Sequence, residues 1–411
     1  MAALKRINQD DLRNHNLSVM MSTLLRSDHP LSRADISKET GLTKATISLL
    51  TSLLLQCGIL SEGRPSFNAT YGRPSTPLTI NRGIVCGIGI QVNADGYGII
   101  AIDLDGTILA EQWRGADLHL ADPRYIFSDI EYMLREQEDV LRLHGYLIAG
   151  TCMALPGLVT DGRVLVEARN LNWRNLDLST VPFVNRMHVL AGNSASMAAV
   201  SQIPGYATPI QPDMPLNSNS SFIYVSSDVG IGGALVRNGV LIKGDHGYAG
   251  ELGHLSVDLH GPKCVCGRNG CLEAIAGRRS MIKLAGVAEG VEAASLESYN
   301  EFLQLAQQGQ PEVIKTLDQG AEAMASALAS VVNLSDIDTI VVDGVWANVA
   351  GNYLQKIQDM IQQQILARNN VQVKVMSVYG RVRPAIIGAA LTGLHGFLDT
   401  PTKYMIPPII L

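Results

Sequence analysis

Apolar residues between positions 16 and 57 recur at helical spacing, in three stretches that polar residues separate. In the last stretch Ile47, Leu50 and Leu54 fall at i, i+3 and i+7, which places them on one face of a helix. The pattern therefore predicts three helices within residues 16–57.

Capping residues mark the boundaries of the second and third helices. Ser32, with Asp35 three positions on, fits a capping box at the start of the second helix. Gly41 supplies the left-handed turn that ends this helix, and Thr43 can cap the next one. Two helices joined by such a turn form the helix-turn-helix pattern, although an ordinary helical hairpin has the same local sequence.

Residues 59–80 break into short segments around two Gly-Arg-Pro sequences, at 63–65 and 72–74. Glycine and proline interrupt regular structure, so these segments predict a hairpin with Arg64 and Arg73 in its loop. A basic hairpin directly after a helix-turn-helix is typical of a winged helix-turn-helix.

From residue 84 the pattern changes to β-rich and then to mixed α/β. Two strand meanders are predicted, at 84–91, 97–103 and 107–110 and again at 221–226, 232–236 and 240–243. Each has a turn sequence at its second connection, Asp105-Gly106 in the first and Asn238-Gly239 in the second. The repetition predicts a duplicated fold of two lobes with a cleft between them. Residues 206–220, rich in Pro, Asn and Ser, predict a surface loop.

The composition is that of a globular protein, with 46% hydrophobic and 17% charged residues in 411 positions. This length predicts two or three structural units. No apolar run is long enough to span a membrane, and residues 1–20 are too polar for a secretory signal, so a cytoplasmic protein without a membrane partner is expected.

Charge is distributed unevenly along the chain. Residues 1–80 carry nine Lys and Arg against six Asp and Glu, a net charge of +3, whereas the remainder carries −9. A basic N-terminal segment followed by an acidic remainder is typical of a nucleic-acid-binding module joined to another domain. With the predicted wing, this asymmetry favours DNA binding over an ordinary helical hairpin.

One histidine and three cysteines form a compact array, His254, Cys264, Cys266 and Cys271, with glycines interspersed. Three thiolates and an imidazole make a closed tetrahedral set, which favours one structural Zn²⁺ per chain over free buried thiols. Glu251 and Glu273 flank the ligands and either orient the imidazole or face the cleft as acceptors for a polyol.

The segments 248–254 and 264–273 resemble the signature of the ROK family of bacterial repressors and sugar kinases, and 155–159, 170–174 and 386–390 match it further. Residues 16–58 resemble the winged helix-turn-helix found on the family's regulators, including glucose- and N-acetylglucosamine-responsive repressors. The resemblance implies a two-lobed actin/hexokinase-like α/β domain behind the DNA-binding head.

The departures from the family's kinases concern catalysis. The first phosphate loop reads Gln-Val-Asn-Ala-Asp at 91–95, the second begins with Asp228, and the adenine-side glycine pair is reduced to Gly344 alone. Where the kinases have an Asn-Asp pair with a catalytic base, this chain has Asn193 and Ser194. The resemblance therefore implies no enzyme activity and no ATP.

The sugar-facing positions are better preserved. Matched onto this sequence, they are Gly157, Asn170, Asn193, Glu251, His254 and Glu273. Asn170 and Asn193 also suit a purely structural role in turns. The candidate DNA contacts, on the predicted recognition helix and beside it, are Arg33, Thr43, Lys44, Ala45, Thr46, Ser48, Arg64 and Arg73.

Together these patterns predict a winged helix-turn-helix at 1–82, a first lobe at 83–193 plus 384–411, and a second lobe at 194–383 with the zinc site. The expected function is a transcriptional regulator, as a repressor of carbohydrate genes, that binds double-stranded operator DNA as a homodimer or homotetramer under control of a sugar or sugar-phosphate effector. The alternatives are an active sugar kinase with a DNA-binding head and a regulator controlled by a protein partner.

Overall fold

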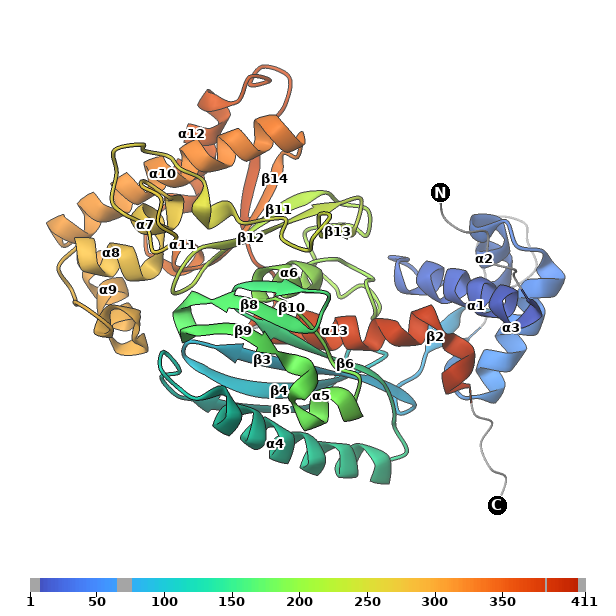
Figure 1. Ribbon diagram of the computed structural model, residues 1–411. Coiled ribbons are helices and arrows are strands. Elements are labelled where there is room, and N and C mark those ends of the chain that lie inside the picture. The colour runs from blue at the N-terminus through green and yellow to red at the C-terminus, as the bar shows by residue number, and fades with distance from the viewer. Residues whose placement is uncertain (1–7, 65–75, 381–382, 406–411) are drawn as a thin grey trace.

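A computed structural model of the chain describes residues 8–64, 76–380 and 383–405. At one end of the molecule lies a small head (Figure 1). Its helices are α1 (Gln9–Leu25), α2 (Arg33–Thr40) and α3 (Lys44–Gln56), followed by the antiparallel strands β1 (Leu60–Glu62) and β2 (Leu78–Ile80). In the described part of the chain, no helix has the length and apolar character that a membrane crossing requires.

The predicted capping residues are confirmed. Ser32 and Asp35 form a reciprocal capping box at the start of α2, and Gly41 ends this helix with a φ of 72°. Thr43 caps α3 by accepting a hydrogen bond from the Thr46 amide. The first helix begins earlier than the apolar pattern indicated, because Asn8 provides a further capping box among polar residues.

The first lobe has a five-stranded sheet in the order β10-β6-β3-β4-β5. Strands β3 (Val85–Asn93), β4 (Gly96–Asp103) and β5 (Ile108–Gly115) form an antiparallel meander, and β6 (Leu147–Leu155) and β10 (Leu190–Asn193) add parallel strands. Helix α4 (Pro123–Leu143) covers one face, and α13 (Pro384–Asp399) packs on the other (Figure 1). The first predicted meander is thus confirmed, with β5 longer than expected.

The second lobe repeats this topology. Its sheet has the order β13-β12-β11-β14-β15, so again three antiparallel strands are followed by two parallel ones. Its strands are β11 (Phe222–Ser227), β12 (Gly232–Arg237), β13 (Val240–Ile242), β14 (Thr339–Gly344) and β15 (Lys374–Ser377). Asn238 and Gly239 turn the β12–β13 hairpin with φ angles of 51° and 70°, the geometry of a type I′ turn.

Smaller elements complete the lobes. A three-stranded sheet of β7 (Leu158–Thr160), β8 (Val164–Ala168) and β9 (Trp173–Asp177) precedes α5 (Pro182–Arg186) in the first lobe. The helices of the second lobe are α7 (Leu272–Ala276), α8 (Arg278–Leu284), α9 (Leu296–Gln307), α10 (Pro311–Ser335), α11 (Val345–Asn348) and α12 (Tyr353–Gln364). Four short 3-10 helices also belong to the two lobes: η1 (Arg169–Leu171), η2 (Leu178–Thr180), η3 (Leu252–His254) and η4 (Glu292–Ala294).

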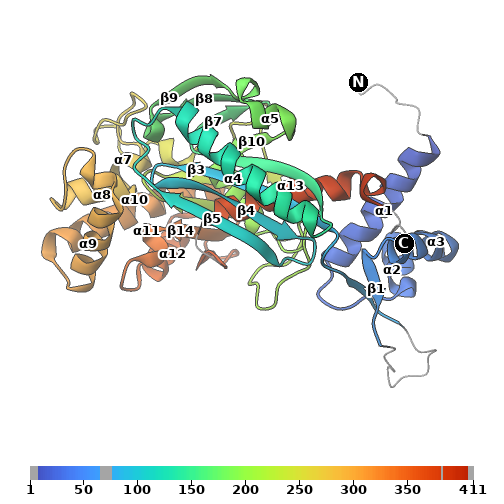
Figure 2. The same cartoon turned by 90° about the horizontal axis from the view of Figure 1, so that it is seen from below.

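Helix α13 connects the centre of the molecule with the head. It packs along α6 (Ser194–Ser201) and β3, and its far end reaches α1 (Figures 1 and 2). In the following turn η5 (Pro401–Tyr404), the Thr402 amide and hydroxyl donate to Asn14 Oδ1 at 3.1 and 2.7 Å. One continuous hydrophobic core therefore joins the head to the first lobe.

The segment 206–220 runs without helix or strand, as predicted, but it is not free of the rest of the molecule. Ala207 is fully buried, and the Ser218 hydroxyl donates to the Arg26 carbonyl of the head at 3.4 Å. The loop is thus a second contact between head and body.

Candidate functional site

A cleft of about 590 Å³ lies between the two lobes. All six residues that the sequence nominated for a sugar line this cleft, as do residues of the four segments in which the sequence departs from the pattern of the family's kinases. The structure thus brings together side chains from positions 91 to 385 of the chain. Clefts of this volume are typical of small-molecule sites.

Asn193 and Gly157 lie in the cleft wall and are joined by a hydrogen bond. Asn193 ends β10 and caps α6, since its Oδ1 accepts from the amides of Ala195 at 2.8 Å and Ser196 at 3.3 Å. Its Nδ2 donates to the Gly157 carbonyl at 2.8 Å. Gly157 has a φ of 100°, and an added Cβ would lie 2.0 Å from the Glu167 carbonyl oxygen. Both residues therefore have a structural role in addition to any contact with a ligand.

Two carboxylates enter the cleft from the second lobe. Glu273, on α7, accepts from the Ile231 amide at 2.9 Å, which fixes its Oε2. Desolvation, and then the neighbouring Glu273 carboxylate, raise the pKa of Glu251 above its ordinary value. Both glutamates line the cleft, so they are positioned as acceptors for hydroxyl groups.

His254, Cys264, Cys266 and Cys271 form a compact cluster beside the cleft. Their ligand atoms all lie within 4.8 Å of one another. Cys264 Sγ is 3.8 Å from His254 Nδ1, and Cys266 Sγ is 3.5 Å from Cys271 Sγ. Tetrahedral zinc–thiolate bonds of about 2.3 Å bring sulfur atoms about 3.8 Å apart, so this donor set fits a metal ion.

The loop that carries the thiols is shaped by its backbone. Gly267 and Gly270 have φ angles of 91° and 61°. A Cβ on Gly270 would lie 1.5 Å from the Asp258 carbonyl oxygen, so no other residue fits there. The Gly270 amide in turn donates to the Pro262 carbonyl at 2.8 Å. These contacts shape the loop whose three thiols lie within 4.8 Å of one another.

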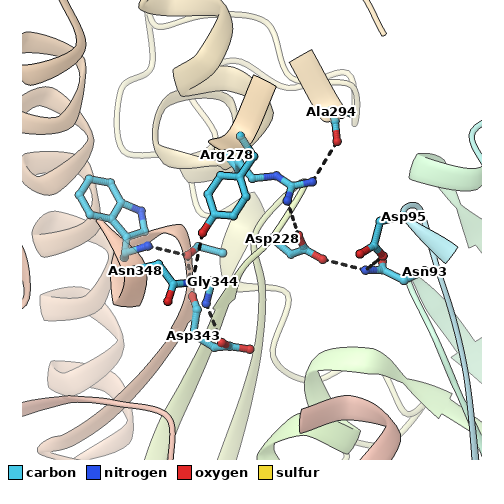
Figure 3. Close-up of polar contacts among 11 residues, drawn as sticks. Asn93, Asp95, Asp228, Arg278, Ala294, Asp343, Gly344 and Asn348 are labelled. Carbon is cyan, nitrogen blue, oxygen red and sulfur yellow. Dashed lines mark hydrogen bonds and ion pairs between the residues drawn. The ribbon is translucent and has the colours of Figure 1, made fainter. Parts of the chain in front are cut away.

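The other half of the cleft contains a polar cluster that links the lobes (Figure 3). Asn93, at the end of β3, donates to Asp95 and to Asp228, each at 2.8 Å. Asp228 also pairs with Arg278, Nη1 to Oδ1 at 3.1 Å, and Arg278 donates to the Ala294 carbonyl at 3.0 Å. Burial, and then the Asp228 carboxylate, raise the pKa of Asp95.

Three residues of this half were not predicted from the sequence. Arg278 is 4% exposed, and its guanidinium lies 4.8 Å from the ring centre of Tyr299. Arg383 has a left-handed φ of 63°, and its guanidinium stacks on Trp113 at 3.9 Å. All three line the cleft, but their places in the chain form no motif.

The candidate DNA surface lies on the head. Lys44, Ala45 and Ser48 are exposed on α3, whereas Thr46 is half-buried and its hydroxyl lies 2.9 Å from that of Thr43, which is exposed. Arg33 pairs with Glu62 at 2.8 Å, so it is less available than the sequence indicated.

Two more DNA contacts were predicted in the loop of the expected wing, and one exposed apolar residue of α3 was not predicted. Arg64 is exposed, and Arg73 lies outside the described residues. The sequence did not nominate Leu49, which is 62% exposed on the same face of α3 as Ala45. Its helical spacing from Ala45 was the signal available, because exposed apolar groups on such a helix can contact thymine methyl groups.

Comparison with known proteins extends this description. The sequence model of the ROK family matches residues 87–393. The xylose repressor of Bacillus subtilis (strain 168) is 25% identical over 398 residues, which cover 96% of this chain and 99% of the repressor. The N-acetylmannosamine kinase of Escherichia fergusonii is 29% identical and covers 71% of this chain and 97% of the kinase.

Solved structures give the same picture of the fold. A ROK family transcriptional regulator, described as a homolog of the E. coli MLC protein, has a TM-score of 0.75 at 22% identity and covers 96% of this chain and 99% of that one. A ROK family glucokinase from Streptomyces griseus, solved with glucose and AMPPNP, has a TM-score of 0.60 at 21% identity and covers 74% of this chain and 98% of its own.

Proposed function

The chain belongs to the ROK family, and we propose that it is a sugar-responsive transcriptional repressor whose kinase-like domain no longer phosphorylates. The observation that carries this proposal is the extent of the matches. A repressor aligns over 96% of the chain, whereas a kinase of the family aligns over 71%. The helices α1 to α3 with their wing strands precede residue 87, where the family match begins.

We assign the chain to three functional units. Residues 1–82 bind operator DNA, residues 83–193 with 384–411 form the first lobe of the sensor, and residues 194–383 form the second. We expect paired heads, in a homodimer or homotetramer, to meet two half-sites of the operator. The test is selection of binding sites from a random duplex pool; a pool without an enriched sequence would contradict the proposal.

The cleft supports sugar binding without phosphoryl transfer. Asp228 lies where the resemblance assigns nucleotide phosphates, and a carboxylate there repels phosphate. Ser194 stands at the position of the catalytic base, and a hydroxyl of ordinary pKa cannot replace a carboxylate in that role.

Assays of ATP-dependent phosphorylation over a panel of pentoses, hexoses and N-acetylhexosamines are expected to give no turnover above the buffer control. The physical reason is that Ser194 stands in place of the carboxylate base and that Asp228 stands in the second phosphate loop. Robust turnover with any of these sugars would identify the chain as an active kinase with a DNA-binding head.

Helix α13 offers a physical connection from the cleft to the DNA-binding head. Pro384 and Ala385, at its start, line the cleft, and α6, which begins at Ser194 in the cleft wall, packs along it. Its far end contacts α1 of the head. A sugar that favours one arrangement of the lobes would therefore shift the head, by at most its difference in affinity between the two arrangements.

The cluster of one imidazole and three thiolates supports one structural Zn²⁺ per chain, held by His254, Cys264, Cys266 and Cys271. When bound, zinc in such a closed set supplies structural order and leaves no position for activating water. Because the four ligands lie between Glu251 and Glu273 in the chain, the bound ion would restrict the positions of both carboxylates.

Lys44→Ala is expected to weaken binding to a random-sequence duplex and to lower the slope of log K against log salt by about 0.9, the value for one phosphate contact. Lys44 is exposed at the start of α3. Lys315→Ala, which removes an equally charged and 66% exposed side chain from α10, is the matched control. Salt titrations of wild type and both variants make the comparison, and an unchanged slope for Lys44→Ala would show that this lysine does not touch phosphate.

A further inference from the structure

The cleft extends well beyond the residues matched to a single sugar ring. Its lining runs from His254 and Glu273, beside the thiol cluster, to Asp343 and Asn348 at the end of β14 and in α11. A volume of about 590 Å³ falls within the range of about 300–1,000 Å³ that drug-sized ligands occupy. One monosaccharide is much smaller than such a ligand and fills only part of this space.

Several residues in both halves of the cleft lining carry a buried polar atom without a partner. In the part of the chain that the structure describes, nine buried side-chain nitrogen or oxygen atoms have no hydrogen-bond partner, and five of them belong to residues of the cleft lining. These five atoms are Gln91 Oε1, Arg169 Nη1, Ser194 Oγ, Arg278 Nε and Arg383 Nε. Because an unpaired buried polar atom is costly, their concentration here points to a ligand that contacts both halves.

The charges of the lining define the chemistry of that ligand. Six carboxylates line the cleft against three arginines; the carboxylates are those of Asp95, Glu167, Asp228, Glu251, Glu273 and Asp343. Arg169 is paired with Glu167 at 2.8 Å and Arg278 with Asp228 at 3.1 Å, so neither has a free charge for an anion; the third arginine, Arg383, stacks on Trp113. A phosphate ester is therefore disfavoured, and a neutral ligand with many hydroxyl groups fits the mixture of donors and acceptors.

We propose that the half of the cleft around Asn93, Asp228, Arg278, Tyr299 and Asn348 is a second sugar subsite, so that the effector is a neutral disaccharide or comparable glycoside. The Tyr299 hydroxyl accepts from Asn348 Nδ2 at 3.1 Å, which leaves its proton free to donate. Figure 3 shows Asp228, Arg278 and Asn348 gathered around this half. The inference rests on the proposed sugar response and names its ligand class.

Calorimetric titration of the full chain with matched pairs tests this inference. The probes are glucose with cellobiose and maltose, xylose with xylobiose, and N-acetylglucosamine with its β-1,4 dimer. At least one disaccharide is expected to bind tenfold or more tighter than its own monosaccharide, about the effect of one or two added hydrogen bonds. Glucose 6-phosphate, included as an anionic probe, is expected to bind more weakly than glucose.

Asn348→Ala separates the two halves of the cleft. Asn348 is exposed on α11, so its loss leaves the core intact. The variant is expected to lose the disaccharide's advantage while its affinity for the monosaccharide stays within about twofold. Gln355→Ala, which removes a surface amide paired with Asp359 on α12, is the control and should change neither affinity.

Three results would contradict the second subsite, and two others would contradict the proposed function. Equal affinity for a monosaccharide and its dimers, equal weakening of both by Asn348→Ala, or preference for glucose 6-phosphate would overturn the second subsite while the proposed sugar response stands. If no sugar of either size binds, or if bound sugar leaves DNA affinity unchanged, the proposed function itself fails. DNA binding measured on the same preparations distinguishes these cases.

Discussion

Cys266→Ser is expected to yield a protein that lacks stoichiometric zinc and no longer releases DNA when sugar is added. Cys266 lies 3.5 Å from Cys271 and is the least buried of the three clustered thiols. Structural zinc contributes about 10–16 kcal/mol of binding free energy in small zinc-dependent domains, so losing one of four ligands removes most of the order in this loop. The loop joins Glu251 to Glu273, so both carboxylates are expected to shift in the cleft, Glu273 less than Glu251 because the Ile231 amide still holds it.

The head shares its hydrophobic core with the first lobe, whereas the cysteine cluster belongs to the second lobe, so the head is expected to stay folded in this variant. The measurement is metal content together with sugar-dependent release of a selected DNA site, on one preparation. Val265→Ser is the matched control, because Val265 is the neighbouring residue and is 71% exposed. A zinc-free Cys266→Ser protein that still responds to sugar would show that the cluster has only a structural role and does not influence signalling.

The elements that could be predicted from the sequence are those with local signals. Ser32, Asp35 and Gly41 define α2 through contacts within a few residues, and Asn238-Gly239 defines a hairpin by its own backbone preference. The cysteine array and the family signature likewise lie within one short stretch. Because such interactions close over short distances along the chain, their spacing survives in the sequence.

The features that were missed depend on residues far apart in the chain. Asn93 and Asp228 meet across 135 positions, and Asn14 and Thr402 across 388. The pairing of Arg33 with Glu62 is of the same kind, since the hairpin strand β1 must fold back on α2 before the two charges meet. No periodicity encodes such contacts, so only the folded chain reveals that Asn93 pairs with Asp228, that Arg278 and Tyr299 line the cleft, and that α13 connects the cleft to the head.

Gly388→Ala is expected to cost about 3 kcal/mol of unfolding free energy, at the upper end of what overpacking usually costs. A Cβ at this position in α13 would lie 1.6 Å from the Met197 carbonyl oxygen and 3.2 Å from the Ser201 amide, both on α6. Because these atoms are backbone, no side-chain rotation relieves the clash and the two helices must separate. Gly388 therefore tests whether α6 and α13 are in direct contact.

Gly115→Ala is the matched control, because the nearest atom to a Cβ there, the Asp95 carbonyl oxygen, is 4.0 Å away. Denaturant unfolding of both variants gives the free energies. Since α13 joins the cleft to α1, Gly388→Ala is also expected to weaken sugar-dependent DNA release in the molecules that remain folded. Stability within about 0.5 kcal/mol of wild type, the scatter of neutral surface changes, would show that α6 and α13 do not pack this closely. Unchanged sugar-dependent DNA release would show that the signal takes another route.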